Sequence, residues 1–431
     1  MTITDEYLAA VRDRGPRASD VLAASRGDLN STWYQTGYLS RPVFLGRARF
    51  RQLVADLDVL ASTLTRVPEL IFDGDLAACA RAVGLTGPQV QAIRRCHGTP
   101  PSRLARADLY QHETGFGLLE INFGSNLGGL DNAVLNDAML RQQPFVADFV
   151  ARHELTHLDT MAELARTVLD ECRVPAGTRP FVAAAEWPGR WPELRDLLRR
   201  STAALGPFGL DGEACPLDDL TYTDDGVWLG GRRVDIVYRL FHLEDLLQPG
   251  MPELIEPLLR AVERGQVSIF TALDGDLYGS KGMLALLSDP RHRQLFTAAE
   301  RASLDRILPW TRTVSPDLRA YIEANQSELV LKPPVEHGGQ GVVLGWLTDA
   351  QTWRRRVAEA LRSPYIVQRR IRPVLELFPT DDGVEPWLLT WGAFTTSRGF
   401  GGFWMRGSRE LGGGVVNMQT GATAMCCFHQ T

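Results

Sequence analysis

The spacing of hydrophobic positions divides the chain into a helical first quarter and a mixed remainder. In residues 48–67, apolar side chains recur at intervals of three and four, which is the period of an amphipathic helix. The run Gly-Thr-Pro-Pro-Ser at 98–102 breaks such a pattern. We therefore expect residues 1–105 to form a mainly helical N-terminal segment.

The next part of the chain alternates between strand-like and helix-like patterns. Two strands at 106–110 and 117–122, joined by a short turn, precede a long helical stretch from about 131 to 171. The alternation that follows is typical of a small α/β lobe with parallel strands. Its expected elements are strands at 181–187, 227–229 and 234–238, and helices at 192–205 and 252–264.

The last part contains a helical block and then a strand-rich block. Residues 281 to about 321, including Pro-Trp-Thr-Arg at 309–312, are predicted to be helical. Strands are expected at 328–333, 341–346, 364–371, 386–397 and 402–408. The predicted fold class is therefore α+β or α/β, with parts at 1–105, 106–171, 172–265 and 266–431.

Composition restricts the class of protein. The chain has 431 residues, 44% hydrophobic and 23% charged, with a formal net charge of −6, which is ordinary for a globular protein. Scattered, mildly acidic charge argues against a nucleic-acid partner. No apolar run approaches the roughly 20 residues of a membrane span, and the start lacks a signal peptide. Six cysteines without a CxxC pair fit a reduced compartment, so we expect a cytoplasmic protein.

The basic residues are unusually uneven. Of the 46 lysines and arginines only Lys281 and Lys332 are lysines. Arginine and lysine are not interchangeable at a tight site, because one is a planar fork and the other a compact point charge. We therefore expect these two positions to require an ammonium group.

Three oxygen-bearing side chains lie on the predicted strand pair. Glu120 and Asn122 are two residues apart and so project from the same side of a strand, with Asp108 on its neighbour. Carboxylates and amide oxygens suit Mg²⁺, which usually also binds phosphate oxygens and water. The alternative is the solvated polar face of a hairpin.

A second candidate is the loop after Lys332. The strand ending in this lysine leads into Gly338, Gly339 and Gly341, whose backbone N–H groups can bind phosphates, although the loop is not a Walker A sequence. A plain hairpin turn is the alternative. Lys281 follows Ser280 at an expected helix start, where anions are favoured, or it is an ordinary surface lysine.

The segment His153 to His157 matches the HExxH zinc template, in which two histidines share a helix face. A third ligand is needed, and Glu163 occupies the position where one zincin class has histidine. Thr160 replaces the glycine of that class. An ordinary amphipathic helix is the alternative.

Taken in order, these features resemble a circularly permuted ATP-grasp ligase, such as the synthetase domain of glutathionylspermidine synthetase. The Arg-x-Asp and Glu-x-Asn pattern of that family is matched by Arg106, Asp108, Glu120 and Asn122. The resemblance extends over about 106–431. It implies a permuted ATP-grasp core with its metal-binding part at 106–171, a pre-ATP-grasp-like α/β lobe at 172–265, and the lysine and glycine-loop lobe with the remaining core at 266–431.

The resemblance also implies ATP and Mg²⁺ as cofactors and an ADP-producing carboxylate–amine ligase acting through an acyl phosphate. Its partners would be a small-molecule or short-peptide carboxylate and an amine, which suits peptide natural-product biosynthesis. The alternatives are a HExxH zinc metallohydrolase and a catalytically silent ATP-grasp-like binding protein. The implied residues are Asp108, Glu120 and Asn122 for metal; Lys281, Lys332, Gly338, Gly339, Gly341, Gln368 and Arg369 for nucleotide, with the strand at 365–369 presenting its backbone to adenine; Ser125 and Asn126 for substrate; and Arg106 and Arg406 for catalysis.

Overall fold

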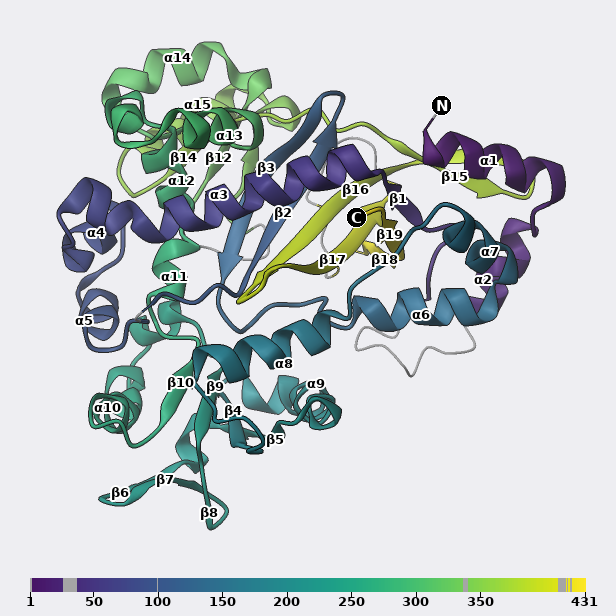
Figure 1. Cartoon of the computed structure of the whole chain (residues 1–431). Coiled ribbons are helices and arrows are strands. Elements are labelled where there is room, and N and C mark those ends of the chain that lie inside the picture. Colours follow the sequence, from purple (N-terminus) through teal and green to yellow (C-terminus); the bar gives the residue numbers. More distant parts are fainter. Residues whose placement is uncertain are drawn as a thin grey trace.

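A six-stranded antiparallel sheet joins the early and late parts of the chain. The computed structural model describes residues 2–25, 37–98, 100–335, 340–409, 416, 418 and 421–431. The hairpin β2 (Ala105–His112) and β3 (Gly115–Phe123) pairs through β2 with β16 (Gly383–Thr396), and β17 (Gly399–Ser408) and β18 (Thr423–Met425) continue the sheet. β15 (Glu376–Thr380) pairs with β16 beyond this path. Segments almost 300 residues apart therefore lie side by side (Figure 1).

The amphipathic helix predicted at 48–67 is confirmed as α3 (Arg47–Phe72), which runs along the central sheet (Figure 1). Its buried face includes Phe50, Leu53, Leu57, Leu60 and Leu64. The described residues of the N-terminal segment are mainly helical, as expected, and they include a short strand, β1 (Val43–Leu45), that pairs in parallel with β19 (Cys427–His429). Its other helices are α1 (Ile3–Arg14), α2 (Ala18–Ser25), α4 (Leu76–Ala82) and α5 (Gly87–Arg95).

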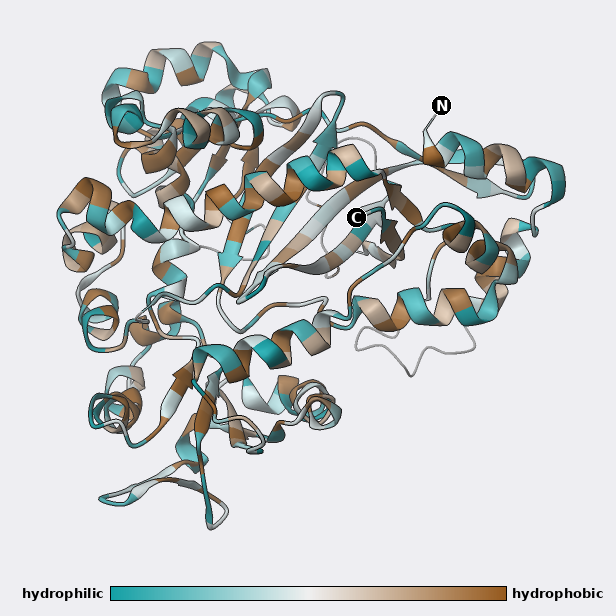
Figure 2. Cartoon of the chain, in the orientation of Figure 1, coloured by the Kyte–Doolittle hydropathy of each residue, from teal (hydrophilic) through white to brown (hydrophobic). Residues whose placement is uncertain are grey.

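The expected parallel sheet is present. Its strand order is β10 (Ser268–Phe270), β9 (Ile236–Arg239), β4 (Phe181–Glu186) and β5 (Asp211–Pro216), and every pair is parallel. β4 is buried along its whole length, and the strands are coloured mainly as hydrophobic in Figure 2. α9 (Trp191–Ala203) and α10 (Met251–Glu263) flank this sheet.

The strand expected at 227–229 does not belong to the parallel sheet. It is β7 (Gly226–Leu229), the centre of a separate antiparallel sheet with β6 (Thr221–Thr223) and β8 (Arg232–Arg233). This small sheet projects from the lobe in Figure 1. The sequence pattern located the strand but could not identify its partners.

A third sheet carries Lys332. It consists of β11 (Thr311–Thr313), β14 (Ile366–Arg369), β12 (Leu329–Lys332) and β13 (Val343–Leu344), all antiparallel, with α14 (Arg319–Ala324) and α15 (Ala350–Ala360) nearby. The helical prediction for 309–312 was wrong. α13 (Ala298–Ile307) ends before Pro309, a residue that cannot continue a helix, and Thr311 begins β11. The strand predicted at 341–346 is reduced to β13.

The helical stretch expected from about 131 to 171 is helical but divided into three helices. The segment forms α6 (Asn132–Gln142), α7 (Pro144–Arg152) and α8 (Thr160–Glu171). Pro144 starts a new helix because its fixed φ suits a first turn and its missing N–H ends the previous one. The Asp159 carboxylate caps α8 by accepting from the N–H groups of Met161 and Ala162. Among the described residues, no helix is both long and apolar enough to cross a bilayer.

Candidate active site

The β2–β3 hairpin places four polar side chains on one face of the central sheet. In the strand register, Arg106 lies opposite Asn122 and Asp108 lies opposite Glu120. Directly paired residues share a face, and so do residues two apart on one strand. The arrangement expected from the spacing of these residues is therefore formed.

Two arginines hold Asp108. The Arg106 guanidinium donates to both carboxylate oxygens, at 2.8 and 3.1 Å, and Arg406 lies 2.8 Å from Oδ2. Burial disfavours the charged carboxylate, but the two guanidinium groups outweigh it and hold the pKa of Asp108 below its ordinary value. Both arginines also stack on the Trp404 ring, at 4.6 and 4.0 Å from its centroid.

Glu120 lies between the two lysines. Lys281 begins α12 (Lys281–Ser288), and its Nζ is 3.0 Å from Glu120 Oε2. Burial of Glu120 opposes ionisation, but Lys281 and then Lys332 attract its negative charge and lower its pKa to about 2. Both lysines are buried, so neither is the surface lysine of the alternative interpretation.

Lys332 Nζ donates to the backbone oxygen of Leu119 and to Gln368 Oε1, each at 2.7 Å. Burial lowers its pKa to about 8, although Glu120 pulls in the opposite direction. The Gln368 amide nitrogen in turn donates to Thr311 Oγ1 at 3.2 Å. The ammonium is thus held by two short hydrogen bonds at a fixed place.

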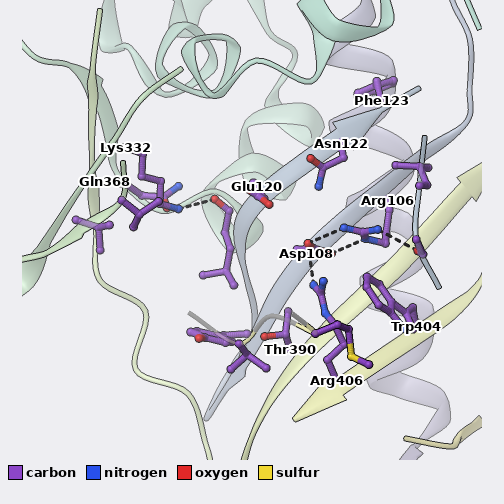
Figure 3. A pocket seen from close by; sticks show the side chains of 18 of the residues that line it. Arg106, Asp108, Glu120, Asn122, Phe123, Lys332, Gln368, Thr390, Trp404 and Arg406 are labelled. Carbon is purple, nitrogen blue, oxygen red and sulfur yellow. Dashed lines mark hydrogen bonds and ion pairs between the residues drawn. The ribbon is translucent and has the colours of Figure 1, made fainter. Parts of the chain in front are cut away.

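Apart from Lys281, which contacts the cavity residue Glu120, these charged side chains line one cavity of about 380 Å³. Figure 3 shows Lys332 and Gln368 at one side, Glu120 and Asn122 in the middle, and Arg106, Arg406 and Trp404 at the other side. The volume lies within the roughly 300–1,000 Å³ usual for ligand sites. At the Lys332 side the walls are largely apolar and include Val330, Leu344 and Trp346.

The residues present fit a Mg²⁺ ion. Asp108, Glu120 and Asn122 offer carboxylate and amide oxygens from one face of the hairpin, which is the donor set that hard cations prefer. Asn122 Nδ2 is buried without a hydrogen-bond partner among the described residues, and the two ends of an amide are distinguished only by their partners. Its amide is thus free to turn its oxygen toward a cation.

Ser125 and Asn126 line the cavity but are already engaged. The Ser125 hydroxyl donates to the backbone oxygen of Arg239 and accepts from the N–H of Thr271, and Asn126 Nδ2 donates to the backbone oxygen of Leu240 at 2.7 Å. These bonds tie the loop after β3 to the carboxyl ends of β9 and β10. Ligands bind at such strand ends in α/β sheets.

Two segments were predicted to bind the nucleotide, the glycine loop at 338–341 and the strand at 365–369. The first is described only in part, and the second is arranged differently from the expectation. Gly338 and Gly339 lie outside the described residues. Gly341 has a φ of +69°, and a Cβ atom there would lie 3.0 Å from the Pro333 ring. Gln368 was expected to present its backbone to adenine. Because β14 lies between β11 and β12, that backbone faces neighbouring strands, whereas the Gln368 side chain accepts from Lys332 Nζ.

The HExxH alternative is contradicted by the local structure, as is the continuous amphipathic helix. α7 ends at Arg152, and Glu154 adopts a left-handed φ of 51°, so the two histidines do not share a helix face. His157 Nε2 lies 3.1 Å from Asp137 instead. No cluster of three histidine, cysteine or acidic side chains that could hold a metal ion occurs in the part of the chain that the structure describes.

A comparison with solved structures finds the same architecture elsewhere. A glutathione synthetase-like effector from Globodera pallida, in its apo form, superposes with a TM-score of 0.59 at 12% sequence identity, over 96% of this chain and 97% of that chain. The two chains share one fold. A putative gamma-glutamylcysteine synthetase from Methylobacillus flagellatus aligns more weakly, with a TM-score of 0.42 and 13% identity, over 86% and 87% of the two chains.

Sequence comparison reaches a shorter part of the chain. No protein-family model matches. A putative glutamate–cysteine ligase of Frankia alni is 36% identical over 132 residues, which are 30% of this chain and 15% of that protein. The chain thus aligns with less than a sixth of this relative.

Several cavity residues were missed by sequence reasoning. Trp404 supports both arginines, Thr390 lies opposite Arg406 in the β16–β17 register, and Asp276 pairs with Arg239 at 2.8 Å. Isolated threonine, tryptophan and aspartate residues on late strands and short helices carry no spacing signal of their own.

Proposed function

We propose that this protein is an ATP-dependent carboxylate–amine ligase with a circularly permuted ATP-grasp core. The observation that carries the proposal is the ordered set of charges along one cavity: Lys332, then Glu120 with Asn122, then Asp108 with its two arginines. The second buried lysine, Lys281, is paired with Glu120. Names of the similar proteins, which include a glutamate–cysteine ligase and a glutathione synthetase-like effector, agree with amide-bond formation.

In this proposal the nucleotide lies at the Lys332 side. Apolar walls from Val330, Leu344 and Trp346 suit a base. Lys332 in the cavity, and Lys281 beside Glu120, would supply positive charge to phosphates. Gly341 belongs to the loop that would cover these phosphates. Arg369 lines the cavity, but its backbone N–H already donates to Trp310, so its contribution would come from its side chain.

Asp108, Glu120 and Asn122 would hold Mg²⁺, which neutralises phosphate charge when bound. This chain's own residues then position the reactants. A carboxylate oxygen of the acyl donor forms a bond to the γ-phosphorus, the bond to the β,γ-bridging oxygen breaks, and ADP leaves. An amine next attacks the acyl phosphate, the C–O bond to phosphate breaks, and an amide, inorganic phosphate and a proton are released.

Arg106 and Arg406 lie where negative charge would develop on the acyl donor. Phosphoryl and acyl transfer need orientation and charge stabilisation rather than a protein nucleophile. Burial of both guanidinium groups strengthens this effect, because charges interact more strongly away from water. Asp108 and the Trp404 ring would fix their orientation.

The direct test is release of ADP and phosphate from MgATP in a screen of amino acids, short peptides, other carboxylic acids and polyamines. We expect release only when a carboxylate and an amine are both present, and loss of release in Glu120→Gln. ATP turnover that persists unchanged in Glu120→Gln would refute the proposed site. A protein that binds MgATP but turns over no donor would instead be a silent binding protein.

A further inference from the structure

We propose that the arginine side of the cavity accepts a carboxylic acid with an apolar side chain rather than a second carboxylate. This inference rests on the proposed function and specifies the acyl donor. It concerns the subsite beyond Arg106 and Arg406, which is lined by Tyr110, Leu127, Trp404, Val416 and Met418.

The walls of this apolar subsite are hydrophobic and held in place. Leu127 and Trp404 belong to one buried cluster, with Met418 packed against it. Trp404 lies directly on the backbone of Gly129, where a Cβ atom would be 2.0 Å from its ring. A fixed aromatic wall with aliphatic neighbours favours burial of apolar surface.

One donor in the subsite lacks an acceptor. Arg406 is 6% exposed, and its Nε has no hydrogen-bond partner among the described residues. Its NH2 group is already occupied by Asp108. A buried N–H without an acceptor is unfavourable, so a ligand oxygen at this point is expected. The carboxylate that reacts can supply that oxygen.

Besides Arg106 and Arg406, Arg239 is the only buried arginine among the described residues that line the cavity, and it is already engaged. The Arg239 guanidinium donates to the backbone oxygens of Thr271, Phe241 and Ala272, and it forms an ion pair with Asp276. Arg370 stacks on Trp346 at the nucleotide side, 4.0 Å from the ring centroid. A dicarboxylic donor such as glutamate would therefore place one charge against Leu127, Trp404 or Met418, which is costly.

The experiment measures ADP release with hydroxylamine as a common amine, so that only the acyl donor varies. Leucine, methionine and phenylalanine, free and as N-acetyl derivatives, are compared with glutamate, aspartate and glycine. We expect kcat/KM for the best apolar donor to exceed that for glutamate by at least about 10-fold, in line with the usual effect of a lost apolar contact. Preference for glutamate would overturn the inference and leave the ligase assignment intact. ADP release with no donor at all would remove both.

A matched pair of variants locates the effect. Met418→Ala should raise the KM for the best apolar donor about 10-fold while the KM for ATP stays the same, because only the apolar subsite loses contact. Met418→Leu restores an apolar side chain of similar volume and should raise this KM much less than Met418→Ala does. A purely structural role for Met418 would change both KM values or kcat alone, and that result would contradict the assignment of the apolar subsite.

Discussion

At the scale of single residues, the site depends on which cation occupies which position. Lys332 is 6% exposed, and its Nζ makes two 2.7 Å hydrogen bonds, to Leu119 and Gln368. A planar guanidinium is larger and cannot satisfy the same two acceptors from one atom. The scarcity of lysine in a chain rich in arginine fits this requirement.

Lys332→Arg therefore keeps the charge but should lower kcat/KM for ATP by about 10²-fold, the usual cost of misplacing one donor in an active site. Steady-state kinetics at saturating acyl donor would measure the change. Arg356→Lys, at an exposed side chain on α15 that pairs with Glu359 at 2.9 Å, is the matched control and should have little effect. Equal activity of Lys332→Arg and the wild type would show that a general positive charge is sufficient.

The same lysine predicts a pH dependence. Burial lowers the pKa of Lys332 to about 8, so its ammonium loses its proton as the pH rises through that value. Since phosphate binding requires the charged form, kcat/KM for ATP should be highest below pH 8 and fall above it. A profile that stays level to pH 9.5 would argue against a role of Lys332 in nucleotide binding.

At the scale of elements, β16 is the strand that allows Arg406 to reach across to Asp108. Gly392 lies between Asp108 on β2 and Trp404 on β17 in the register. A Cβ atom there would lie 2.9 Å from the Trp404 backbone oxygen, 3.1 Å from Arg106 Cδ and 3.4 Å from Asp108 Oδ1. The missing side chain of Gly392 leaves room for the arginine–aspartate cluster.

Gly392→Ala should consequently destabilise the protein by about 1–3 kcal/mol, the usual cost of overpacking, and lower activity as well. Urea unfolding with an activity assay would measure both changes. Gly383→Ala, at the other end of β16, meets nothing within 4 Å and serves as the control. Indistinguishable unfolding curves for the two variants would refute this account of β16.

Local patterns predicted those elements that have a strong period or a clear break. α3 and the β2–β3 hairpin are examples, and the hairpin gave the shared face of Asp108, Glu120 and Asn122 directly. Errors arose where one residue redirects the chain. Pro144 divides the expected long helix, and Pro309 precedes the turn from helix to β11. Hydrophobic periodicity identifies a short strand such as β7 but does not show which sheet it joins.

At the scale of the whole molecule, His429 packs the late strand β19 against the early helix α3. It lies on β19, is 1% exposed, and stacks on Phe50 of α3 at 4.1 Å, with Phe400 and Phe403 nearby. Neither ring nitrogen has a partner among the described residues. Burial lowers its pKa to about 4, and His157 adds to the shift. The folded protein therefore binds this proton less readily than the unfolded chain.

The pKa of His429 in the folded protein lies below its ordinary value of 6.5. The contribution of neutral His429 to the free energy of unfolding is therefore complete above pH 6.5 and is lost as the pH falls toward 4. The loss amounts to roughly 3 kcal/mol across that window. His429→Phe should therefore lose less unfolding free energy than the wild type between pH 7 and pH 4.5, measured by urea denaturation. Parallel losses in the two proteins would contradict the assignment.

The complete site is a property of the folded molecule. Sequence spacing brought Asp108, Glu120 and Asn122 together, but Lys281 and Arg406 reach them only because α12 and β17 fold against the same hairpin. Trp404 and Thr390 had no visible pattern because their role depends on register across β16 and β17. The resemblance placed the two lysines, while their contacts come from the tertiary structure.

The most direct test of the central claim measures the transfer of one oxygen atom from the donor carboxylate to inorganic phosphate. With ¹⁸O in the carboxylate of a donor found by the ADP screen, the acyl phosphate route must transfer one labelled oxygen to inorganic phosphate as the amide forms. We predict labelled phosphate together with ADP, detected by mass spectrometry. Unlabelled phosphate, or label recovered in AMP, would contradict the account.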